Sequence, residues 1–213
     1  MLLIVTATDL EMAPIDRRLA GQSGWTPLVA GIGCLETAVC LTRFLSRNNT
    51  IRAIINCGVA GAFVGAGPGL LDICLAETET LPEAGVLLAD GVHPLDTIRM
   101  PTQFVLDPTL LSTAMTTLVA SGVNVWSGPF VSVLAVSGTL ARGNELRSRH
   151  GALCENMEGA AVARVAQAFS IPCLEVRAVS NMVEDRDVSA WRLPEAIERC
   201  AEAVASLLPG LSL

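Results

Sequence analysis

A helical pattern runs directly into a buried strand between residues 155 and 187. From Met157 the apolar residues recur at positions 161, 165, 168 and 169, which is the spacing of one helix face. This helix is expected to end before Pro172, because the residue that precedes a proline is disfavoured in the helical region. Residues 173–179 are mainly apolar and indicate a strand inside the protein. A helix that feeds a buried strand is typical of an α/β fold.

Polar residues stand at both ends of this helix–strand unit. Glu158 lies at the start of the helix, and Ser180 and Asn181 lie where the strand is expected to end. Ligands bind at the carboxyl ends of strands in open parallel sheets. A carboxylate and an amide in these positions can therefore converge on one small polar ligand. The spacing alone leaves open that Glu158 only complements the helix dipole.

The rest of the chain continues the alternation of strands and helices. Strands are predicted at residues 2–7, 27–30, 51–56, 70–77 and 128–136. Helices are predicted at residues 9–19, 35–45, 108–121, 142–150 and 193–208. Residues 79–101 show little periodicity and predict a long surface excursion near the mouth of a site. With 213 residues and no linker, the chain is expected to form one domain over residues 1–213, with a three-layer core.

Three further segments stand at the ends of predicted strands. Asp9 is expected to cap the first helix, which puts Glu11 in its first turn, either at a site or as a surface acid that complements the helix dipole. Gly31-Ile32-Gly33 begins a GxGxx pattern, but position 36 is a glutamate, which disfavours a dinucleotide site and favours close backbone packing. The backbone amides of the small residues 57–62 could approach a ligand, and a turn that only needs glycine dihedral angles is the alternative.

Missing residue types exclude several kinds of chemistry. All 14 basic residues are arginines, which excludes Schiff-base and pyridoxal-phosphate chemistry and a phosphate-loop lysine. His93 and His150 have no cysteine or carboxylate at metal-ligand spacing, so we expect neither a metal nor an organic cofactor. The net charge of −7 and the lack of a basic run disfavour nucleic acid and anionic membrane surfaces as partners.

The cysteines and the first residues indicate a cytoplasmic protein. The seven cysteines are an odd number scattered through apolar segments without a CxxC pair, as expected of reduced core thiols. The start, MLLIVTATDLE, lacks the basic region of a signal peptide and predicts a strand. The uncharged run at 53–71 contains Pro68 and several glycines, which predicts a strand and a glycine loop rather than a membrane span.

Four segments together resemble one superfamily. ATDLE at 7–11, NCGVAGA at 56–62, NMEGAA at 156–161 and VRAVSN at 176–181 look like the nucleoside phosphorylase and nucleosidase superfamily, in the right order over nearly the whole chain. The segment SNMVEDRDVSAWRLPEAI at 180–197 is similar to the tail of the futalosine hydrolases of that superfamily. The resemblance implies a mixed sheet flanked by helices, a homodimer or higher homo-oligomer, and cleavage of a purine ribosyl bond through an oxocarbenium-like transition state. For futalosine the products would be hypoxanthine and dehypoxanthine futalosine, in menaquinone biosynthesis.

The resemblance also implies roles for single residues. Glu11 matches the carboxylate that activates water, and Asn181 matches the residue that faces the purine. Met157 and Glu158 match the pair that packs on the ribose and binds its hydroxyls. Positive charge grows on the sugar as the glycosidic bond breaks, so carboxylates beside the ribose stabilise the transition state more than the substrate. One carboxylate can accept hydrogen bonds from both ribose hydroxyls.

Other matching positions border the ribose and the base. The small-residue segment beside the ribose matches Val59, Ala60 and Gly61. Leu140 matches a segment that elsewhere supplies an aromatic residue to stack on the base, although the segment here contains none. Aromatic residues elsewhere in the chain that could replace it are Phe104, Phe130 and Trp191.

Asn181 bears on the identity of the base. Adenine-specific nucleosidases of the superfamily carry aspartate at this position, which can protonate the leaving base, whereas an amide can only donate a hydrogen bond. Members of the superfamily that act on 6-oxopurines tend to carry asparagine here, so the resemblance implies a 6-oxopurine such as hypoxanthine. Because asparagine can also pair with the amino edge of adenine, the side chain alone does not exclude a 6-aminopurine as the base.

The attacking group is expected to be water. A phosphorylase needs arginines near the small-residue segment, and residues 56–66 contain none, while Glu11 would repel phosphate. Arg177 and Glu175 are expected to form a pair that is structural or supports the site residues, rather than a catalytic pair. The carboxylate-bearing group of futalosine would meet Arg186 or Arg99. A phosphate-dependent phosphorylase, a methylthioadenosine or adenosylhomocysteine nucleosidase, and a nucleoside-binding module without activity remain the alternatives.

Overall fold

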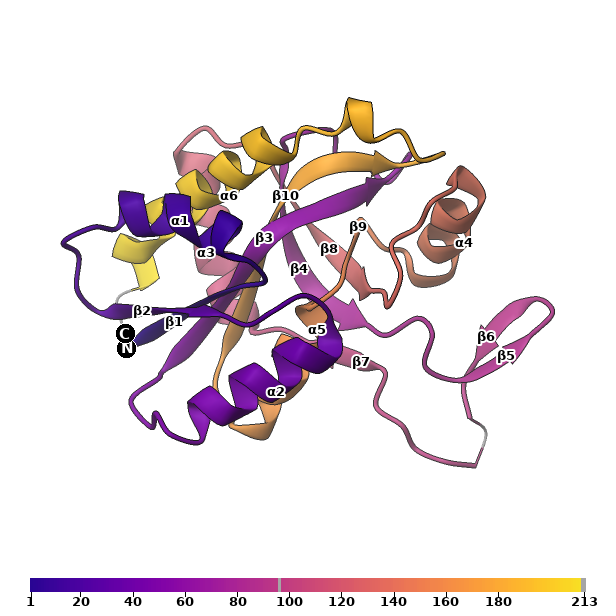
Figure 1. Cartoon of the computed structure of the whole chain (residues 1–213), viewed down its shortest axis with the longest axis horizontal. Coiled ribbons are helices and arrows are strands. Elements are labelled where there is room, and N and C mark those ends of the chain that lie inside the picture. The colour runs from indigo at the N-terminus through magenta and orange to yellow at the C-terminus, as the bar shows by residue number, and fades with distance from the viewer. Residues whose placement is uncertain (96, 212–213) are drawn as a thin grey trace.

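The computed structural model describes residues 1–95 and 97–211 and shows an α/β fold around a central mixed sheet (Figure 1). The strands are β1 (Leu2–Thr6), β2 (Trp25–Val29), β3 (Ala53–Phe63), β4 (Ile73–Thr80), β5 (Val86–Leu88), β6 (Gly91–His93), β7 (Gln103–Val105), β8 (Val125–Ser132), β9 (Cys154–Asn156) and β10 (Cys173–Val183). The helices are α1 (Asp9–Arg18), α2 (Cys34–Leu45), α3 (Pro108–Ala120), α4 (Leu140–His150), α5 (Gly159–Ala168) and α6 (Leu193–Leu207), with the 3-10 helices η1 (Val188–Ala190) and η2 (Leu208–Leu211).

The sheet closes partly on itself around β3. This strand pairs in parallel with β1 and β10 and antiparallel with β9. β10 continues antiparallel to β4, β4 pairs in parallel with β8, and β8 pairs in parallel with β9. Five strands thus form a ring, while β1 and β2 extend the sheet on one side. Because β3 and β10 are parallel neighbours, their carboxyl ends meet at the same edge.

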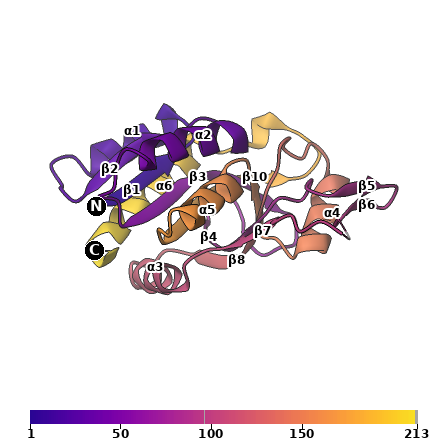
Figure 2. The same cartoon turned by 90° about the horizontal axis from the view of Figure 1, so that it is seen from below.

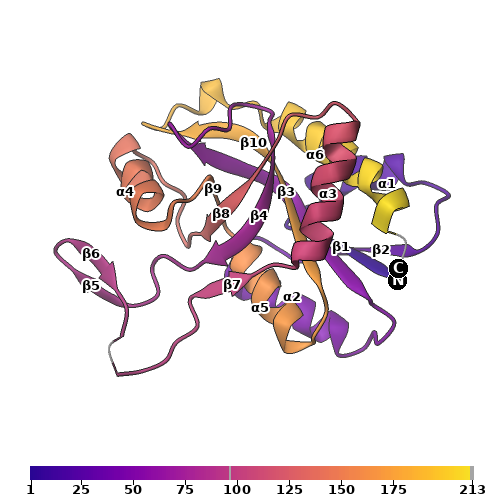
Figure 3. The ribbon, with the colours of Figure 1, turned by 180° about the vertical axis from the view of Figure 1, so that it is seen from behind.

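Helices cover the sheet in two layers, as the fold class inferred from the sequence requires. α1, α3 and α6 pack on one face, and Figure 3 shows α3 beside α6. α2 and α5 lie side by side on the other face (Figure 2). Fully buried side chains such as Ile4, Ile54 and Val204 fill the space between the layers. Each such side chain stabilises the fold by roughly 1.5–3 kcal/mol.

β3 is longer than the sequence predicts: residues 57–62, which were expected to follow the end of the strand, belong to it. β10 pairs with this segment as far as Phe63, and β9 pairs with Gly61 and Ala62. The prediction is wrong at this point because pairing with strands far away in sequence outweighs the low strand preference of glycine and alanine. The glycines inside β3 leave room for other groups to approach its backbone.

Several other boundaries differ from the prediction. The strands predicted at 70–77 and 128–136 correspond to β4 and β8, which begin at Ile73 and Val125. Four strands were not predicted: β7, β9, and the strands β5 and β6, which form a hairpin inside the predicted excursion. Each of them has three residues, which is too short for a periodic pattern. β10 continues to Val183, so Asn181 lies inside the strand and not after it.

The uncharged run at 53–71 forms β3 and the turns that lead to β4. In the described part of the chain, no helix combines the length and the apolar character needed to cross a membrane. All seven cysteines are free thiols, and most of them are buried.

Candidate active site

A cavity of about 320 Å³ opens between the carboxyl-terminal parts of β3 and β10 and the starts of α1 and α6. Its volume is in the range of sites for small ligands. The residues predicted for the site lie in its lining, with the exception of Leu140. They are Glu11, Val59, Ala60, Gly61, Met157, Glu158, Ser180, Asn181 and Arg186. Segments that are far apart in the sequence are therefore brought to one place.

Leu140 lies outside this lining. It is the first residue of α4, and its backbone N–H donates to Asp185 Oδ1 at 3.1 Å. Two of the aromatic residues considered for base stacking, Phe104 and Phe130, are buried in the core beside α5 and do not reach the cavity. Trp191 does line it. None of the described residues in the excursion at 79–101, Arg99 among them, borders the cavity.

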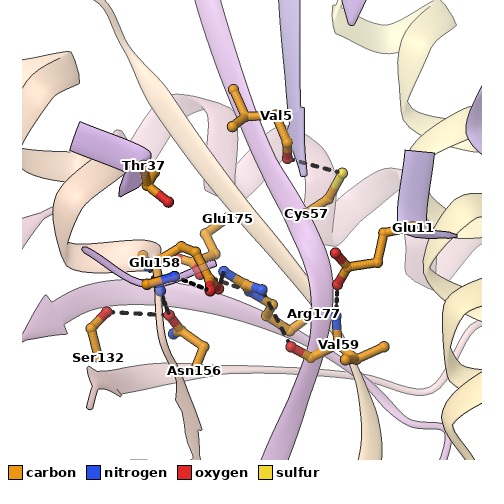
Figure 4. Close-up of polar contacts among 12 residues, drawn as sticks. Val5, Glu11, Thr37, Cys57, Val59, Ser132, Asn156, Glu158, Glu175 and Arg177 are labelled. Atoms are coloured by element: carbon orange, nitrogen blue, oxygen red, sulfur yellow. Dashed lines mark hydrogen bonds and ion pairs between the residues drawn. The ribbon is translucent and has the colours of Figure 1, made fainter. Parts of the chain in front are cut away.

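Glu11 is held at the edge of the cavity by a capping box. Thr8, not Asp9 as predicted, caps α1: its hydroxyl accepts from Glu11 N–H, and Glu11 Oε2 accepts from Thr8 N–H at 3.1 Å. Glu11 Oε1 accepts from Val59 N–H at 3.2 Å (Figure 4). This carboxylate also lies over the Cα of Gly58, where any Cβ would overlap it. Only a glycine at position 58 permits this placement.

Glu158 stands at the start of α5 and shares a buried ion-pair network with β10. Arg177 Nη2 donates to Glu158 Oε2 at 3.5 Å, and Arg177 Nε donates to Glu175 Oε1 at 2.9 Å (Figure 4). Arg177 Nη1 also donates to the carbonyl of Val59 at 3.3 Å. The predicted pair of Arg177 and Glu175 is present. Arg177 additionally lines the cavity although its side chain is only 2% exposed.

The glycine segment before α2 contacts the same carboxylate. Gly33 N–H donates to Glu158 Oε1 at 3.0 Å, and Gly33 has a φ of +88°, a conformation that glycine adopts at little cost. Ile32, between the two glycines, lines the cavity. The backbone amide of this segment therefore binds a carboxylate of the protein itself, which agrees with the sequence argument against a dinucleotide site.

A β-bulge directs Asn181 into the cavity. The pairing of β10 with β3 shifts between Val179 and Asn181, so Ser180 is the extra residue. Ser180 Oγ donates to Asn181 Oδ1 at 2.9 Å, and Asn181 Nδ2 lies 3.2 Å from the Met182 carbonyl. Bulges commonly re-aim side chains next to active sites. The sequence predicts the residue but gives no sign of the bulge that orients it.

Arg186 and Trp191 form one side of the cavity. The guanidinium of Arg186 lies over the indole ring of Trp191, 4.8 Å from its centre. A smaller pocket of about 40 Å³ adjoins this side. Arg186 and Trp191 line it together with Ser137 and Asn181. A cation that lies flat on an aromatic ring keeps most of its N–H groups free for an anionic ligand.

Glu155 is a cavity residue that the sequence argument missed. It is buried, and both carboxyl oxygens accept from Ser137, from its N–H at 2.8 Å and its hydroxyl at 2.6 Å. Burial raises the pKa of this carboxyl group. A glutamate directly before the NMEGAA segment was the available signal, but its strand, β9, is too short to predict.

The cavity combines carboxylates with largely apolar walls. Glu11, Glu155 and Glu158 face it, with Leu10, Ile32 and Ile197 among the apolar lining residues. Carboxylates fixed in a site with little water favour a ligand that develops positive charge. Among the described residues, no group of three or more His, Cys, Asp or Glu side chains is arranged to hold a metal ion.

Residues 19–210 match the model of the phosphorylase superfamily. The chain is 36% identical to a futalosine hydrolase of Streptomyces coelicolor, over 99% of this chain and 96% of that protein. It is also 36% identical to a futalosine hydrolase of Thermus thermophilus, over 98% and 95% of the two chains.

Solved structures show the same fold. A 5'-methylthioadenosine/S-adenosylhomocysteine nucleosidase from Helicobacter pylori superimposes with a TM-score of 0.87 at 19% identity, over 99% of this chain and 98% of that chain. The futalosine hydrolase of Helicobacter pylori superimposes with a TM-score of 0.87 at 19% identity, over 99% and 97% of the two chains.

Proposed function

The chain belongs to the phosphorylase superfamily and, within it, to the family of the futalosine hydrolases, and on this premise we propose that it hydrolyses the N-glycosidic bond of futalosine. The products would be hypoxanthine and dehypoxanthine futalosine, which assigns the enzyme to menaquinone biosynthesis. The observation that carries the proposal is the convergence of Glu11, Glu158 and Asn181 on one cavity. These three groups supply what hydrolysis of a purine nucleoside requires.

Glu158 is the proposed ribose-binding residue. Gly33 and Arg177 each donate to one of its carboxyl oxygens, which fixes the orientation of the group. Each oxygen retains acceptor capacity for a ribose hydroxyl. Positive charge develops on the ribose as the glycosidic bond lengthens. The carboxylate therefore stabilises the transition state more strongly than the bound substrate.

Glu11 is the proposed general base. Its Oε1 and the guanidinium of Arg177 both lie in front of Gly58, because a Cβ at this position would touch Glu11 Oε1 and be 3.0 Å from Arg177 Nη1. A water molecule placed between these groups would be oriented by the guanidinium and give its proton to Glu11 as it attacks the sugar.

Asn181 is the proposed base-binding residue. Its amide can donate a hydrogen bond to ring nitrogen 7 or to the 6-oxo group of hypoxanthine. Negative charge accumulates on the base as it leaves, so this hydrogen bond strengthens in the transition state. The small pocket beside Asn181, Arg186 and Trp191 offers room at this end of the site.

Water is favoured over phosphate because of the charges at the site. Among the described lining residues the arginines are Arg177 and Arg186. Arg177 is already paired with Glu175 and Glu158, and Glu11 approaches from the other side. A phosphate dianion would meet two carboxylates in a site of low dielectric, where like-charge repulsion is strong.

We also propose that the enzyme is a homo-oligomer of the cytoplasm. Ile32, Leu35 and Val39 form an apolar surface at the start of α2, beside the cavity, and Leu35 is 83% exposed. A second copy of the chain would bury this surface. Light scattering should show a dimer or larger assembly, and Leu35→Glu should shift it towards the monomer. A monomeric wild type would contradict the proposed oligomer.

The proposed cytoplasmic location is supported by the seven free thiols, which suit a reducing compartment.

The deciding experiment is incubation of the protein with futalosine, inosine and methylthioadenosine, with and without phosphate. We expect hypoxanthine and a free reducing sugar from futalosine in the absence of phosphate. Release that requires phosphate and yields a sugar 1-phosphate would contradict the proposal. Preferential release of adenine from methylthioadenosine would assign the protein to the other nucleosidases that share its fold.

A further inference from the structure

Two buried carboxyl groups lie in contact behind the cavity. Glu79 on β4 is fully buried, and Glu175 on β10 is 1% exposed. Both lie over Gly159 at the start of α5: a Cβ there would be 2.5 Å from Glu175 Oε2 and still closer to Glu79 Oε1. Because both oxygens lie close to the same point in front of Gly159, the two carboxyl groups are direct neighbours. Two carboxylates in contact inside a protein cannot both be ionised, so this pair shares a proton.

The partners of Glu79 are neutral. Asn156 Oδ1 accepts from the backbone N–H groups of Glu158 at 3.0 Å and Gly159 at 2.7 Å. This fixes the orientation of the amide, so Asn156 Nδ2 faces Glu79 and donates to its Oε1. Ser132 Oγ lies 2.9 Å from Glu79 Oε2. No cation is among these contacts to compensate a charge on Glu79.

Glu175, by contrast, has a charged partner. Arg177 Nε donates to its Oε1 at 2.9 Å, and the same guanidinium reaches Glu158 Oε2 at 3.5 Å. The guanidinium favours the ionised form of Glu175. Burial raises the pKa of both carboxyl groups, but only Glu175 has the guanidinium as a direct partner, so we assign the shared proton to Glu79, whose pKa lies well above its ordinary value.

We propose that Glu79 is a positioning residue of the nucleosidase site: it holds the proton that lets Glu175 remain an anion, so that Glu175 fixes Arg177 and Arg177 fixes Glu158. This inference rests on the proposed ribose-binding role of Glu158. Without the proton, Glu79 and Glu175 would repel each other, and Arg177 would be drawn away from Glu158 and Val59.

Other titratable groups around the pair do not compete for the proton. Glu158 and Arg177 face it on the side of the cavity. On the other sides are the thiols of Cys34, Cys154 and Cys173, whose pKa values are raised chiefly by burial. These thiols therefore remain neutral across the pH range in which a nucleosidase is assayed, and the charge of the cluster changes only when Glu79 loses its proton.

Infrared difference spectroscopy of the unliganded protein tests the proton directly. The carbonyl stretch of a protonated carboxyl group is separate from the bands of carboxylates and amides. We expect such a band at neutral pH in the wild type, its loss in Glu79→Gln, and its retention in Glu77→Gln. Glu77 lies two residues away on β4 and is exposed, and its carboxylate accepts from the hydroxyl of Ser127, which makes it a matched control. Equal spectra of the wild type and Glu79→Gln would overturn the proposal, whatever the enzyme does with futalosine.

Kinetics tests the link to Glu158. The wild type should lose kcat at alkaline pH as Glu79 ionises, and Glu79→Gln, which keeps a neutral side chain of the same size, should not show this loss. Glu79→Ala should lower kcat/KM by at least about tenfold, equivalent to 1.4 kcal/mol of transition-state stabilisation, and Glu79→Gln should recover most of it. If the kcat of Glu79→Gln fell at alkaline pH as it does in the wild type, the positioning role would be overturned. Absence of any futalosine hydrolysis by the wild type would instead refute the proposed function and leave the infrared result standing.

Discussion

The three carboxylates around the cavity differ in their hydrogen-bond partners. Glu158 accepts from Arg177 and Gly33, and Glu155 accepts from the N–H and the hydroxyl of Ser137. Glu11 accepts from Thr8 and Val59 but has no cation in direct contact in the described structure. Glu11 is thus the carboxylate that lies beside Gly58 and Arg177, where the attacking water is proposed to bind, and this position suits the proposed base.

Replacing Glu11 with glutamine should leave the fold intact and remove the base. The capping contacts with Thr8 can be kept in part by the amide oxygen, so binding of futalosine should change little. Loss of a general base costs typically a factor of about 100 to 10,000 in rate, and we expect a fall in kcat of that size. Asp9→Asn, on the exposed side of the same helix turn, is the control for helix effects. A variant of Glu11 with more than a tenth of the wild-type kcat would remove it from the mechanism.

Arg186 should contribute to recognition of the substrate rather than to bond cleavage. Its guanidinium lies over Trp191, and within the described residues it forms no ion pair with a carboxylate. We expect Arg186→Ala to raise the KM for futalosine about tenfold, as for a lost charge-assisted contact of about 1.4 kcal/mol, and to leave the KM for inosine unchanged. Arg192→Ala, at an exposed arginine paired with Glu195, is the control. Equal effects on both substrates would show that Arg186 does not meet the carboxylate of futalosine.

At the scale of elements, β3 and β10 shape the site through interior glycines and a β-bulge. β3 carries Gly58 and Gly61 in its interior, where missing side chains make room for Glu11, Arg177 and Asn181. β10 inserts Ser180 as a bulge. A second bulge, in β4 between Ala76 and Thr78, lies just before Glu79. These departures from regular pairing decide which side chains reach the cavity and which lie at the Glu79–Glu175 pair behind it.

Gly58→Ala should inactivate the enzyme without unfolding it. A Cβ at position 58 would overlap Glu11 Oε1 and approach Arg177 Nη1, the two groups between which water is proposed to bind. We expect kcat/KM to fall at least a hundredfold, because a displacement of about 1 Å at a catalytic group can cost that much. Gly138→Ala, where a Cβ would meet nothing within 4 Å, should behave as the wild type. Circular dichroism checks the fold of both variants, and full activity of Gly58→Ala would refute the proposed water position.

At the scale of the whole molecule, buried Glu79 makes stability depend on pH. Its pKa in the folded protein lies well above its ordinary value of 4.5, so above that pH the folded state keeps a proton that the unfolded chain releases. This contribution to stability is complete below the unfolded pKa and is lost as the pH rises through the folded pKa. Glu79 alone should lower the free energy of unfolding by about 1.4 kcal/mol per pH unit over that range.

Urea unfolding of the wild type and Glu79→Gln at several pH values between 5 and 9 measures this effect. The wild type should become less stable towards alkaline pH, and the variant should show a weaker dependence. Parallel curves would mean that Glu79 is ionised in the folded protein. Glu77→Gln again serves as the control, since its carboxylate is exposed.

The local part of the fold was predictable because its signals are local. Alternating apolar runs and helical spacing located the long strands and most helices within a few residues. Pro172 marked the end of α5, and Val59, Ala60 and Gly61, which were predicted to belong to a site, line the cavity. The short strands β7 and β9 and the bulge at Ser180 were not predictable, because each depends on a partner far away in the sequence. Thr8 was missed although its capping box with Glu11 is a local signal in the sequence.

The sequence by itself determined the fold class and the superfamily, and it named nine residues that line the cavity, since apolar periodicity and short motifs are written along the chain. Only the tertiary structure decided how these residues act on one another. Arg177 lines the cavity because β10 lies beside β3, and Glu79 and Glu175 meet because β4 pairs with β10. Glu158 gains Gly33 as a partner because α2 packs against α5. The charges of a site depend on contacts through space, and no local pattern in a sequence records them.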